Sequence, residues 1–592
     1  MTSTTLPAAS SIFGSKTIII DTTLPTVASF TTATSSGSYN QGEQIVITAN
    51  TSEAIQNGNT ITVTLDTSDT VLLTAGSAGT TLVGTYTVGD NDTSAGLTVS
   101  SFTIGTVADT AGNAMTSTTL PAASSIFGSK TIVIDTTVPA FSSVSPSTNS
   151  TVNTANVGYT LSEAIASGTV KYTRTGGTAD GNSPHTANLA GNELNAGERS
   201  SAALTNAPTL VDGAIYSIAF NGTDAAGNAA TAVTVTGITF DTTAPTAAIT
   251  YSTASPYNNT ETVTITATFN EAMADSPVVK IALSGAATLT ATEMSKVSAT
   301  SYTYSYAVPT ANGTQTVALS VGTDVAGNTI TSAPSSGATF VIDSTPATVT
   351  NVTSSTTNGI YNEGDTISIQ VTFSEVMTVS GTPQLTLETG GSDAVVDYDS
   401  GTGSNTLTFT YTVGAGQTSS DLDYASTGAL ALNSGSILDP AGNASTLTLP
   451  SPGATGSLGA NKALVIDTTA PTVTNVSSST SNGTYDSGNV TINVVFSEVV
   501  DVTGIPQLTL ETGGSDAVVN YASGTGSNTL VFTYTISSGH NSCDLDYVST
   551  GALALNSGTI KDAGENSATL TLASPGATGS LAANNAIVVD TS

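Results

Sequence analysis

Residues 366–375 read Thr-Ile-Ser-Ile-Gln-Val-Thr-Phe-Ser-Glu, and every second residue from Ile367 to Phe373 is apolar. Such alternation is typical of a β-strand that packs one face against a core. Similar runs recur along the chain, and no segment shows a convincing helical period of 3.6 residues. We therefore predict an all-β protein. The apolar positions of the runs are Ile45, Ile47 and Ala49; Val157, Tyr159 and Leu161; Val263, Ile265, Ala267 and Phe269; Ile367, Ile369, Val371 and Phe373; and Val490, Ile492, Val494 and Phe496.

A short motif precedes each of these runs. Asp-Thr-Thr-x-Pro begins at Asp21, Asp135, Asp241 and Asp467, and a contracted form, Asp-Ser-Thr-Pro, begins at Asp343. The spacing from one motif to the next lies between 102 residues (Asp241 to Asp343) and 124 residues (Asp343 to Asp467). A repeat of this length is a whole domain. We predict five domains, with the boundaries 21–134, 135–240, 241–342, 343–466 and 467–592.

The first twenty residues repeat residues 115–134 with one difference, Ile19 in place of Val133. We interpret residues 1–20 as the C-terminal strand region of a preceding, truncated repeat. The chain is then expected to be a segment of a longer protein, so the lack of a signal peptide at its N-terminus says little about its location.

Further strands are expected at Thr406–Thr412, Thr529–Thr535, Tyr302–Val308 and Val233–Phe240, with turns rich in Gly, Asn, Asp and Ser between them. Several short strands per hundred residues favour a β-sandwich of immunoglobulin-like architecture. The predicted fold is a tandem array of such sandwiches. A small barrel is the structural alternative.

Charge limits the partners of this chain. It carries 43 acidic residues against 9 Lys and Arg, for a formal net charge of −34. Nucleic acid is not an expected partner, because phosphate contacts need basic residues. No apolar run is long enough to span a bilayer, so no membrane insertion is expected in this segment. A single cysteine, Cys543, excludes an intrachain disulfide. Divalent cations are the natural counterions.

Three acidic residues recur at corresponding positions of every repeat. They are the linker Asp, a Glu that closes the alternating strand, and the Asp of an Asp-x-Ala-Gly-Asn loop before the last strand, with the Asn of that loop as a fourth member. The fifth loop differs and reads Asp-Ala-Gly-Glu-Asn. The candidate metal ligands are Asp21, Glu53, Asp109 and Asn113; Asp135, Glu163, Asp224 and Asn228; Asp241, Glu271, Asp324 and Asn328; Asp343, Glu375, Asp439 and Asn443; and Asp467, Glu498, Asp562 and Asn566.

The topology of a sandwich predicts that the three acidic residues of each repeat lie close together. The linker, the end of the second strand and the loop before the last strand all fall at one pole of an immunoglobulin-like domain. Three carboxylates with amide oxygens form the oxygen-rich site that Ca²⁺ prefers. The alternative is turn chemistry, because Asp-Thr-Thr and Asp-x-Ala-Gly-Asn are also good turn sequences. The altered fifth loop predicts the weakest site, and the pairs Asp421/Asp423 and Asp544/Asp546 are either a second ion site or solvated turns.

Longer motifs in the fourth repeat resemble the bacterial Ig-like repeats of giant calcium-dependent surface adhesins, of the cadherin-like or RTX-adhesin extender type. The fifth repeat nearly duplicates the fourth, whereas the first three share only the sparser acidic frame. This resemblance implies an extracellular, bacterial cell-surface stalk of β-sandwiches that calcium makes rigid. The motifs are Tyr361-x-x-Gly364-Asp365, Phe373-Ser-Glu375, Thr382-Pro-Gln-Leu-Thr-Leu-Glu-Thr389, Asp421-Leu-Asp-Tyr424 and Asp439-x-Ala-Gly-Asn443.

Catalysis is not expected. The chain has only two histidines, His185 and His540, in unrelated contexts, and it lacks the nucleophile and phosphate-binding motifs of common enzymes. Besides the stalk, two other functions remain open. One is a subunit of a self-assembling extracellular filament or surface layer, in which copies of the chain contact each other. The other is a carbohydrate-binding accessory module, against which the absence of Trp counts.

Overall fold

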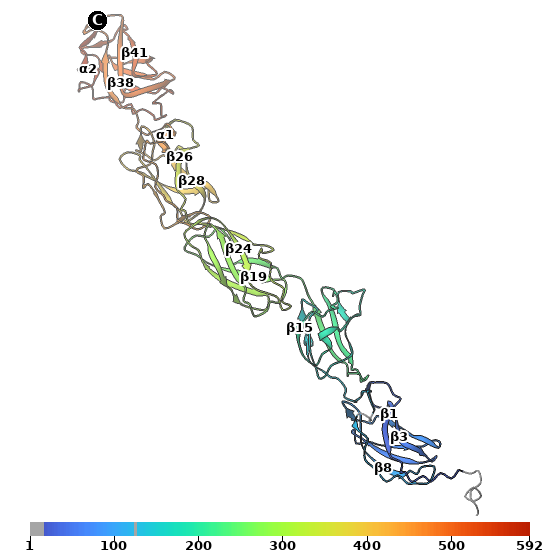
Figure 1. Ribbon diagram of the computed structural model, residues 1–592. Helices are drawn as coiled ribbons and strands as arrows, with labels where there is room; N and C mark the ends of the chain where they lie inside the picture. The colour runs from blue at the N-terminus through green and yellow to red at the C-terminus, as the bar shows by residue number, and fades with distance from the viewer. Residues whose placement is uncertain (1–16, 124–126) are drawn as a thin grey trace, which may run out of the picture.

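The computed structural model describes residues 17–123 and 127–592. Figure 1 shows their strands gathered into five successive units, numbered here from the N-terminus, that follow one another end to end in an extended row. Each unit has its own hydrophobic core, and no residue belongs to two cores. The cores span Val27–Ile134, Phe141–Phe240, Ala247–Ile342, Ala347–Ile466 and Val476–Val589.

Every unit consists of two β-sheets around its core, which makes the chain an all-β tandem array of immunoglobulin-like sandwiches. In unit 1 one sheet has the order β1 (Val27–Thr32), β3 (Gln44–Ile55), β6 (Gly79–Thr87), β5 (Thr70–Thr74), β4 (Thr60–Leu65), β8 (Val99–Thr106). The other has the order β2 (Gly37–Tyr39), β9 (Ile132–Asp135), β7 (Thr93–Ser94).

Units 2 and 3 divide their strands more evenly between the sheets. In unit 2 the orders are β10 (Phe141–Ser145), β12 (Val157–Leu161), β15 (Gly197–Ala202), and β11 (Thr151–Val152), β17 (Val233–Phe240), β16 (Ala214–Thr223), β13 (Ser167–Gly177), β14 (His185–Asn188). In unit 3 they are β18 (Ala247–Tyr251), β19 (Thr262–Phe269), β23 (Ser301–Ala307), β22 (Ser295–Lys296), and β21 (Leu289–Glu293), β20 (Lys280–Gly285), β24 (Asn312–Ser320), β25 (Thr339–Asp343).

Units 4 and 5 share one topology, as their near-identical sequences require. Unit 4 has β26 (Val349–Ser354), β28 (Thr366–Ser380), β31 (Ser404–Thr412), β30 (Ala394–Ser400), β29 (Gln384–Leu387), β33 (Leu430–Ala431), with β34 (Ser436–Leu438) on β28, and a second sheet of β27 (Gly359–Tyr361), β35 (Leu464–Asp467), β32 (Thr418–Ser419). Unit 5 has β36 (Val473–Ser478), β38 (Asn489–Thr503), β41 (Ser527–Thr535), β40 (Ala517–Ser523), β39 (Gln507–Glu511), β43 (Asp546–Tyr547), with β44 (Leu553–Ala554) on β39 and β45 (Thr559–Lys561) on β38. Its second sheet is β37 (Gly483–Tyr485), β46 (Ile587–Asp590), β42 (Asn541–Ser542).

The alternating runs are strands, as predicted. In β28 the side chains of Ile367, Ile369, Val371 and Phe373 are each no more than 1% exposed, and the residues between them are partly exposed. The strand pairs antiparallel with β31 in the register Ile369 to Phe409. Burial of one face by β-branched and aromatic side chains is therefore what holds each central strand in its sheet.

The last strand of each unit leads directly into the next linker. In unit 1, β9 pairs in parallel with the short strand β2 and ends at Asp135, one residue after the buried Ile134. β35 repeats this arrangement with β27 and ends at Asp467. The linker aspartates thus sit where the chain leaves one core for the next.

Two one-turn helices, α1 (Leu458–Asn461) and α2 (Leu581–Asn584), were not apparent in the sequence, because four residues are too few to show a helical period. Ser457 caps α1 by accepting the N–H of Ala460, and the Asn461 amide donates to the Val352 carbonyl. Each helix therefore fastens the segment before the last strand to the first strand of its unit. Among the described residues, no helix has the length and apolar character needed to cross a membrane.

The interpretation of residues 1–20 as a strand region falls largely on residues 1–16, which lie outside the described residues. Thr17–Ile20 has no strand conformation, and Ile19 and Ile20 are exposed.

Candidate metal centres

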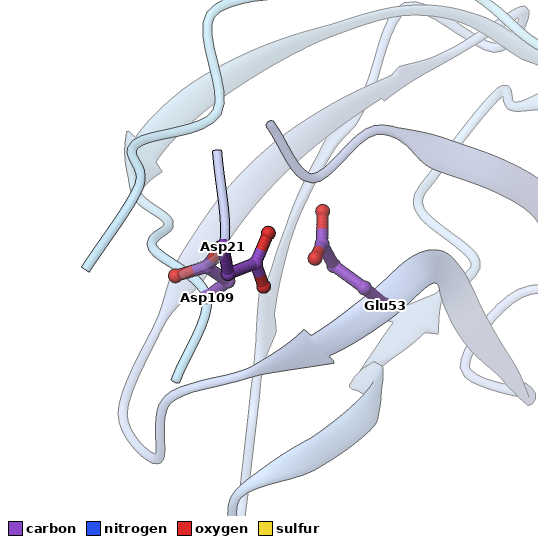
Figure 2. A group of neighbouring side chains, drawn as sticks. All are labelled: Asp21, Glu53 and Asp109. Carbon is purple, nitrogen blue, oxygen red and sulfur yellow. The ribbon is translucent and has the colours of Figure 1, made fainter. Parts of the chain in front are cut away.

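Three carboxylates gather at one pole of every unit. In each group, one oxygen from each carboxylate lies within 4.8 Å of the other two. Figure 2 shows this in unit 1, where Glu53 reaches from β3 toward Asp21 and Asp109. The three segments that supply the carboxylates are far apart in sequence, so the fold brings them together as the topology predicted. The groups are Asp21, Glu53, Asp109; Asp135, Glu163, Asp224; Asp241, Glu271, Asp324; Asp343, Glu375, Asp439; and Asp467, Glu498, Asp562.

The linker Asp connects two units within one cluster. Asp135 is the last residue of β9 in unit 1, yet its carboxylate joins Glu163 and Asp224 of unit 2. Its Oδ1 also accepts the backbone N–H of Thr137 at 3.0 Å, and each other linker Asp does the same two residues ahead. The turn predicted from Asp-Thr-Thr is thus present, and the cluster is present with it.

In units 1, 4 and 5 the Glu lies at an irregularity in the pairing of the central strand. In β28 the pairing with β31 is regular to Thr372 and resumes at Met377, and the irregular step encloses Glu375. The prediction that the Glu closes the strand is correct for units 2 and 3 but wrong for units 1, 4 and 5, where the strand continues past it. In unit 4 the continuation pairs with β34, because the break lets the strand bend from one partner to another.

The loop Asp is held by the Asn four residues later. Asp109 is 1% exposed, and its Oδ1 and Oδ2 accept the backbone N–H and the side-chain Nδ2 of Asn113, both at 2.8 Å. The same Nδ2 donates to the backbone carbonyl of Asp21 at 3.1 Å. This pattern recurs in all five loops, with Asn228, Asn328, Asn443 and Asn566 donating to the carbonyls of Asp135, Asp241, Asp343 and Asp467.

The asparagines, which the sequence suggested as ligands, have a positioning role through their amide nitrogens, and the ligand role of their Oδ1 atoms stays a prediction. Each one ties the loop Asp to the linker. The altered fifth loop keeps these bonds, since Asn566 donates to Asp562 and to the Asp467 carbonyl. The difference is local, because Glu565 has a positive φ of 68° where the other loops have glycine.

The close carboxylates of each cluster affect one another's ionisation. Burial, followed by the charges of the two neighbouring aspartates, raises the pKa of each glutamate, Glu53, Glu163, Glu271, Glu375 and Glu498. For Asp109, burial opposes ionisation, but the hydrogen bonds from Asn113, Gly112 and Ala111 outweigh it and lower the pKa. The cluster of unit 1 thus combines Asp109, whose hydrogen bonds favour the ionised form, with Glu53, which the same site disfavours as an anion.

The donor set fits a divalent cation. Glu53 and Glu163 each have a buried Oε1 without a hydrogen-bond partner, which is a costly state for a carboxylate oxygen unless a cation meets it. All ligands are oxygens, and opposite ligands on Ca²⁺ lie about 4.6–5.2 Å apart. The spacing within 4.8 Å suits such an ion. An open cavity of about 430 Å³, lined by Val133–Asp135 and Glu163 among others, gives solvent access to the unit 2 cluster.

One aspartate of each of the pairs Asp421/Asp423 and Asp544/Asp546 has a structural role. Asp423 is 8% exposed, and its Oδ2 accepts the N–H of Gly453 at 2.9 Å. Asp546 likewise accepts the N–H of Gly576 at 2.8 Å. These carboxylates fasten the segment before the short helices, and the solvated-turn alternative is wrong for both of them because they are buried.

One set of residues was missed. Asn40, Asn153 and Asn258 lie just after the short strand segment beside each last strand, and their amides approach the Asp-x-Ala-Gly-Asn loop of the following unit. The Tyr-Asn pairs at Tyr39-Asn40 and Tyr257-Asn258 were a signal that could have pointed to two of them, whereas Asn153 follows Val152 and carries no such signal.

Fold and clusters define a tandem β-sandwich protein with a repeated acidic centre at the pole where each unit receives its linker. No family model matches the chain, and no curated protein matches it. Among solved structures, it is similar to an ICAM-5 D1–D4 ectodomain fragment, with 11% identity over 65% of this chain and 98% of that one and a TM-score of 0.21. It is also similar to a Streptomyces avermitilis α-L-rhamnosidase complexed with L-rhamnose, with 9% identity over 69% of this chain and 58% of that one and a TM-score of 0.12. At these scores neither likeness carries an argument about this chain.

Proposed function

We propose that this chain is a non-catalytic stalk segment of a secreted bacterial surface adhesin, located outside the cell and made rigid by Ca²⁺ at the junctions between its units. The observation that carries the proposal is the fivefold recurrence of one carboxylate cluster that takes its linker Asp from the point where each unit begins. An enzyme needs one such site, whereas a structural role explains its repetition in every unit.

A cation at these centres would act on the linker directly. In the cluster of unit 4, Asp343 ends strand β25 of unit 3, whereas Glu375 and Asp439 belong to the body of unit 4. An ion bound by all three restrains the last strand of one unit against the pole of the next. Without it, the three carboxylates repel one another, and the junction is held by hydrogen bonds alone, such as that from Asn443 Nδ2 to the Asp343 carbonyl.

Composition suits this role. The surface combines 43 acids with many Ser and Thr, and 9 basic residues offer little attraction for nucleic acid or anionic lipid. A ten-residue strand spans about 33 Å, so five units end to end would make a rod of roughly 200 Å. A filament built by strand exchange has less support, because each core already includes its own last strand, for example Ile132 and Ile134 in unit 1.

Small-angle scattering and thermal melting, in millimolar Ca²⁺ and again in chelator, test the proposal. We expect a longer, stiffer particle and a higher melting temperature with Ca²⁺, because ligands that bind only the folded state stabilise it. Mg²⁺ at the same concentration is the control and should act less, because it keeps its waters. Identical scattering and melting with and without Ca²⁺ would refute the calcium stalk.

A further inference from the structure

A second contact crosses the junction between units 3 and 4. Asn258 follows Tyr257, which bridges in parallel to Ile342 of the last strand of unit 3. The Asn258 side chain is turned into unit 4, where its Nδ2 donates to the Ala441 carbonyl at 2.9 Å. Asn258 is 6% exposed, so this hydrogen bond is shielded from water. The bond therefore attaches the body of unit 3 to the loop that contains Asp439.

An asparagine amide also approaches this loop at the two preceding junctions, where the described residues show proximity but no hydrogen bond. A Cβ built on Gly227 of unit 2 would lie 3.2 Å from Nδ2 of Asn40 in unit 1, and one on Gly327 of unit 3 would lie 3.4 Å from Nδ2 of Asn153 in unit 2. At the junction of units 3 and 4, Gly442 and Asn258 are also 3.4 Å apart by this measure.

Glycine serves two purposes in these loops. Gly227, Gly327 and Gly442 have φ values of +95°, +97° and +83°, which L-residues rarely adopt. Each also leaves the space into which the asparagine of the preceding unit fits. A side chain at this position would stand in the path of that amide.

The junction of units 4 and 5 departs from this pattern. Glu565 takes the position of the glycine, as its N–H donates to the Asp562 carbonyl at 3.2 Å just as Gly442 donates to Asp439 at 3.0 Å. Its carboxylate turns to Lys561 at 3.1 Å. In the part of the chain that the structure describes, the Asn362 amide donates no hydrogen bond to unit 5, and the same is true of the Asn40 and Asn153 amides and the units that follow them. The Asn362 backbone donates to Asp365 of its own unit just as the Asn40 backbone donates to Glu43. What distinguishes this junction is the side chain of Glu565 in the place of the glycine.

We propose that the asparagine contact sets the orientation of the first three junctions, and that the junction of units 4 and 5 is the hinge of this chain. A linker alone attaches neighbouring units at one point and permits them to swivel. The asparagine adds a second point on another segment, and two separated attachments define an orientation. This inference goes beyond the stalk function, because the amide contact needs no ion.

Distance distributions between pairs of spin labels test the inference on the full chain, with Cys543→Ser to remove the native thiol. Val395→Cys with Val518→Cys reports the junction of units 4 and 5, and Ala291→Cys with Val395→Cys reports that of units 3 and 4. All three label positions are exposed and lie on strands. We expect a distribution at least about twice as wide at the junction of units 4 and 5, and equal widths would overturn the proposal.

Two sets of substitutions test whether the asparagine contact and the loop sequence cause the difference in width. Asn258→Ala should widen the distribution between units 3 and 4, whereas Asn259→Ala, which removes an amide bonded within unit 3 to Thr310, should not. The triple variant Ala563→Pro, Gly564→Ala, Glu565→Gly gives unit 5 the loop sequence of unit 4 and should narrow the distribution between units 4 and 5. Unchanged widths in these variants, with normal melting of the units, would also overturn the hinge.

Each measurement is made in Ca²⁺ and in chelator, which separates the two proposals. If no Ca²⁺ binds but the widths differ as expected, the calcium stalk fails and the hinge stands. If Ca²⁺ binds and stiffens all junctions equally, the hinge fails and the calcium stalk stands.

Discussion

The substitution Glu163→Gln separates a metal ligand from a turn residue. It keeps the shape of the side chain and removes one negative charge. Glu163 suits the purpose because its Oε1 is buried without a partner and its carboxylate faces Asp135 and Asp224. If the cluster is a cation site, this variant has opposite effects with and without the ion.

The expected change in stability follows from the distance between the carboxylates. Two unit charges 4.8 Å apart repel by about 0.9 kcal/mol at the dielectric constant of water and by about 3.5 kcal/mol at an effective value of 20. We therefore expect Glu163→Gln to stabilise unit 2 by about 1–3 kcal/mol in chelator. With Ca²⁺ the affinity of this site should fall at least about tenfold, or 1.4 kcal/mol.

Calorimetric titration of the full chain counts the ions, and hydrogen exchange reads the stability of unit 2. Wild-type protein should bind ions at five sites, one for each cluster, and the variant should bind the ion of unit 2 at least about tenfold more weakly. Glu198→Gln, an exposed carboxylate in the same unit, is the matched control and should change neither quantity. The reasoning is refuted if Glu163→Gln destabilises unit 2 in both conditions or leaves the Ca²⁺ affinity of its cluster unchanged.

Three further predictions concern stability, each read by hydrogen exchange with denaturant. Asn328→Ala removes the bonds to the linker carbonyl and to the loop carboxylate, and should cost unit 3 about 1–3 kcal/mol even in chelator; wild-type stability would contradict the positioning role. Although burial opposes ionisation of Glu193, three hydrogen bonds lower its pKa. Its contribution should be present above the unfolded value of about 4.3 and be lost as pH falls through the lower folded value, and Glu193→Gln should abolish this dependence. Gly84→Ala places a Cβ 2.5 Å from the Leu72 carbonyl and should cost unit 1 about 1–3 kcal/mol, whereas Gly79→Ala, with open space, should not.

The sequence by itself determined the strands and the register of the acidic residues. The alternation in 366–375 is local information, because a residue's face on a strand depends only on whether its position is odd or even. The recurrence of Asp, Glu and Asp in every repeat, combined with the pole that each strand end occupies in a sandwich, was enough to predict that Asp241, Glu271 and Asp324 meet.

Only the tertiary structure decided how those residues are held. Whether Asn328 offers its oxygen or its nitrogen depends on the position of the Asp241 carbonyl, 87 residues away in sequence. Whether strand β28 ends at Glu375 depends on a partner, β34, beyond the break. The contact of Asn258 with Ala441 spans 183 residues and two units. These features depend on atoms that approach only after folding, and no local pattern of residues encodes such distances.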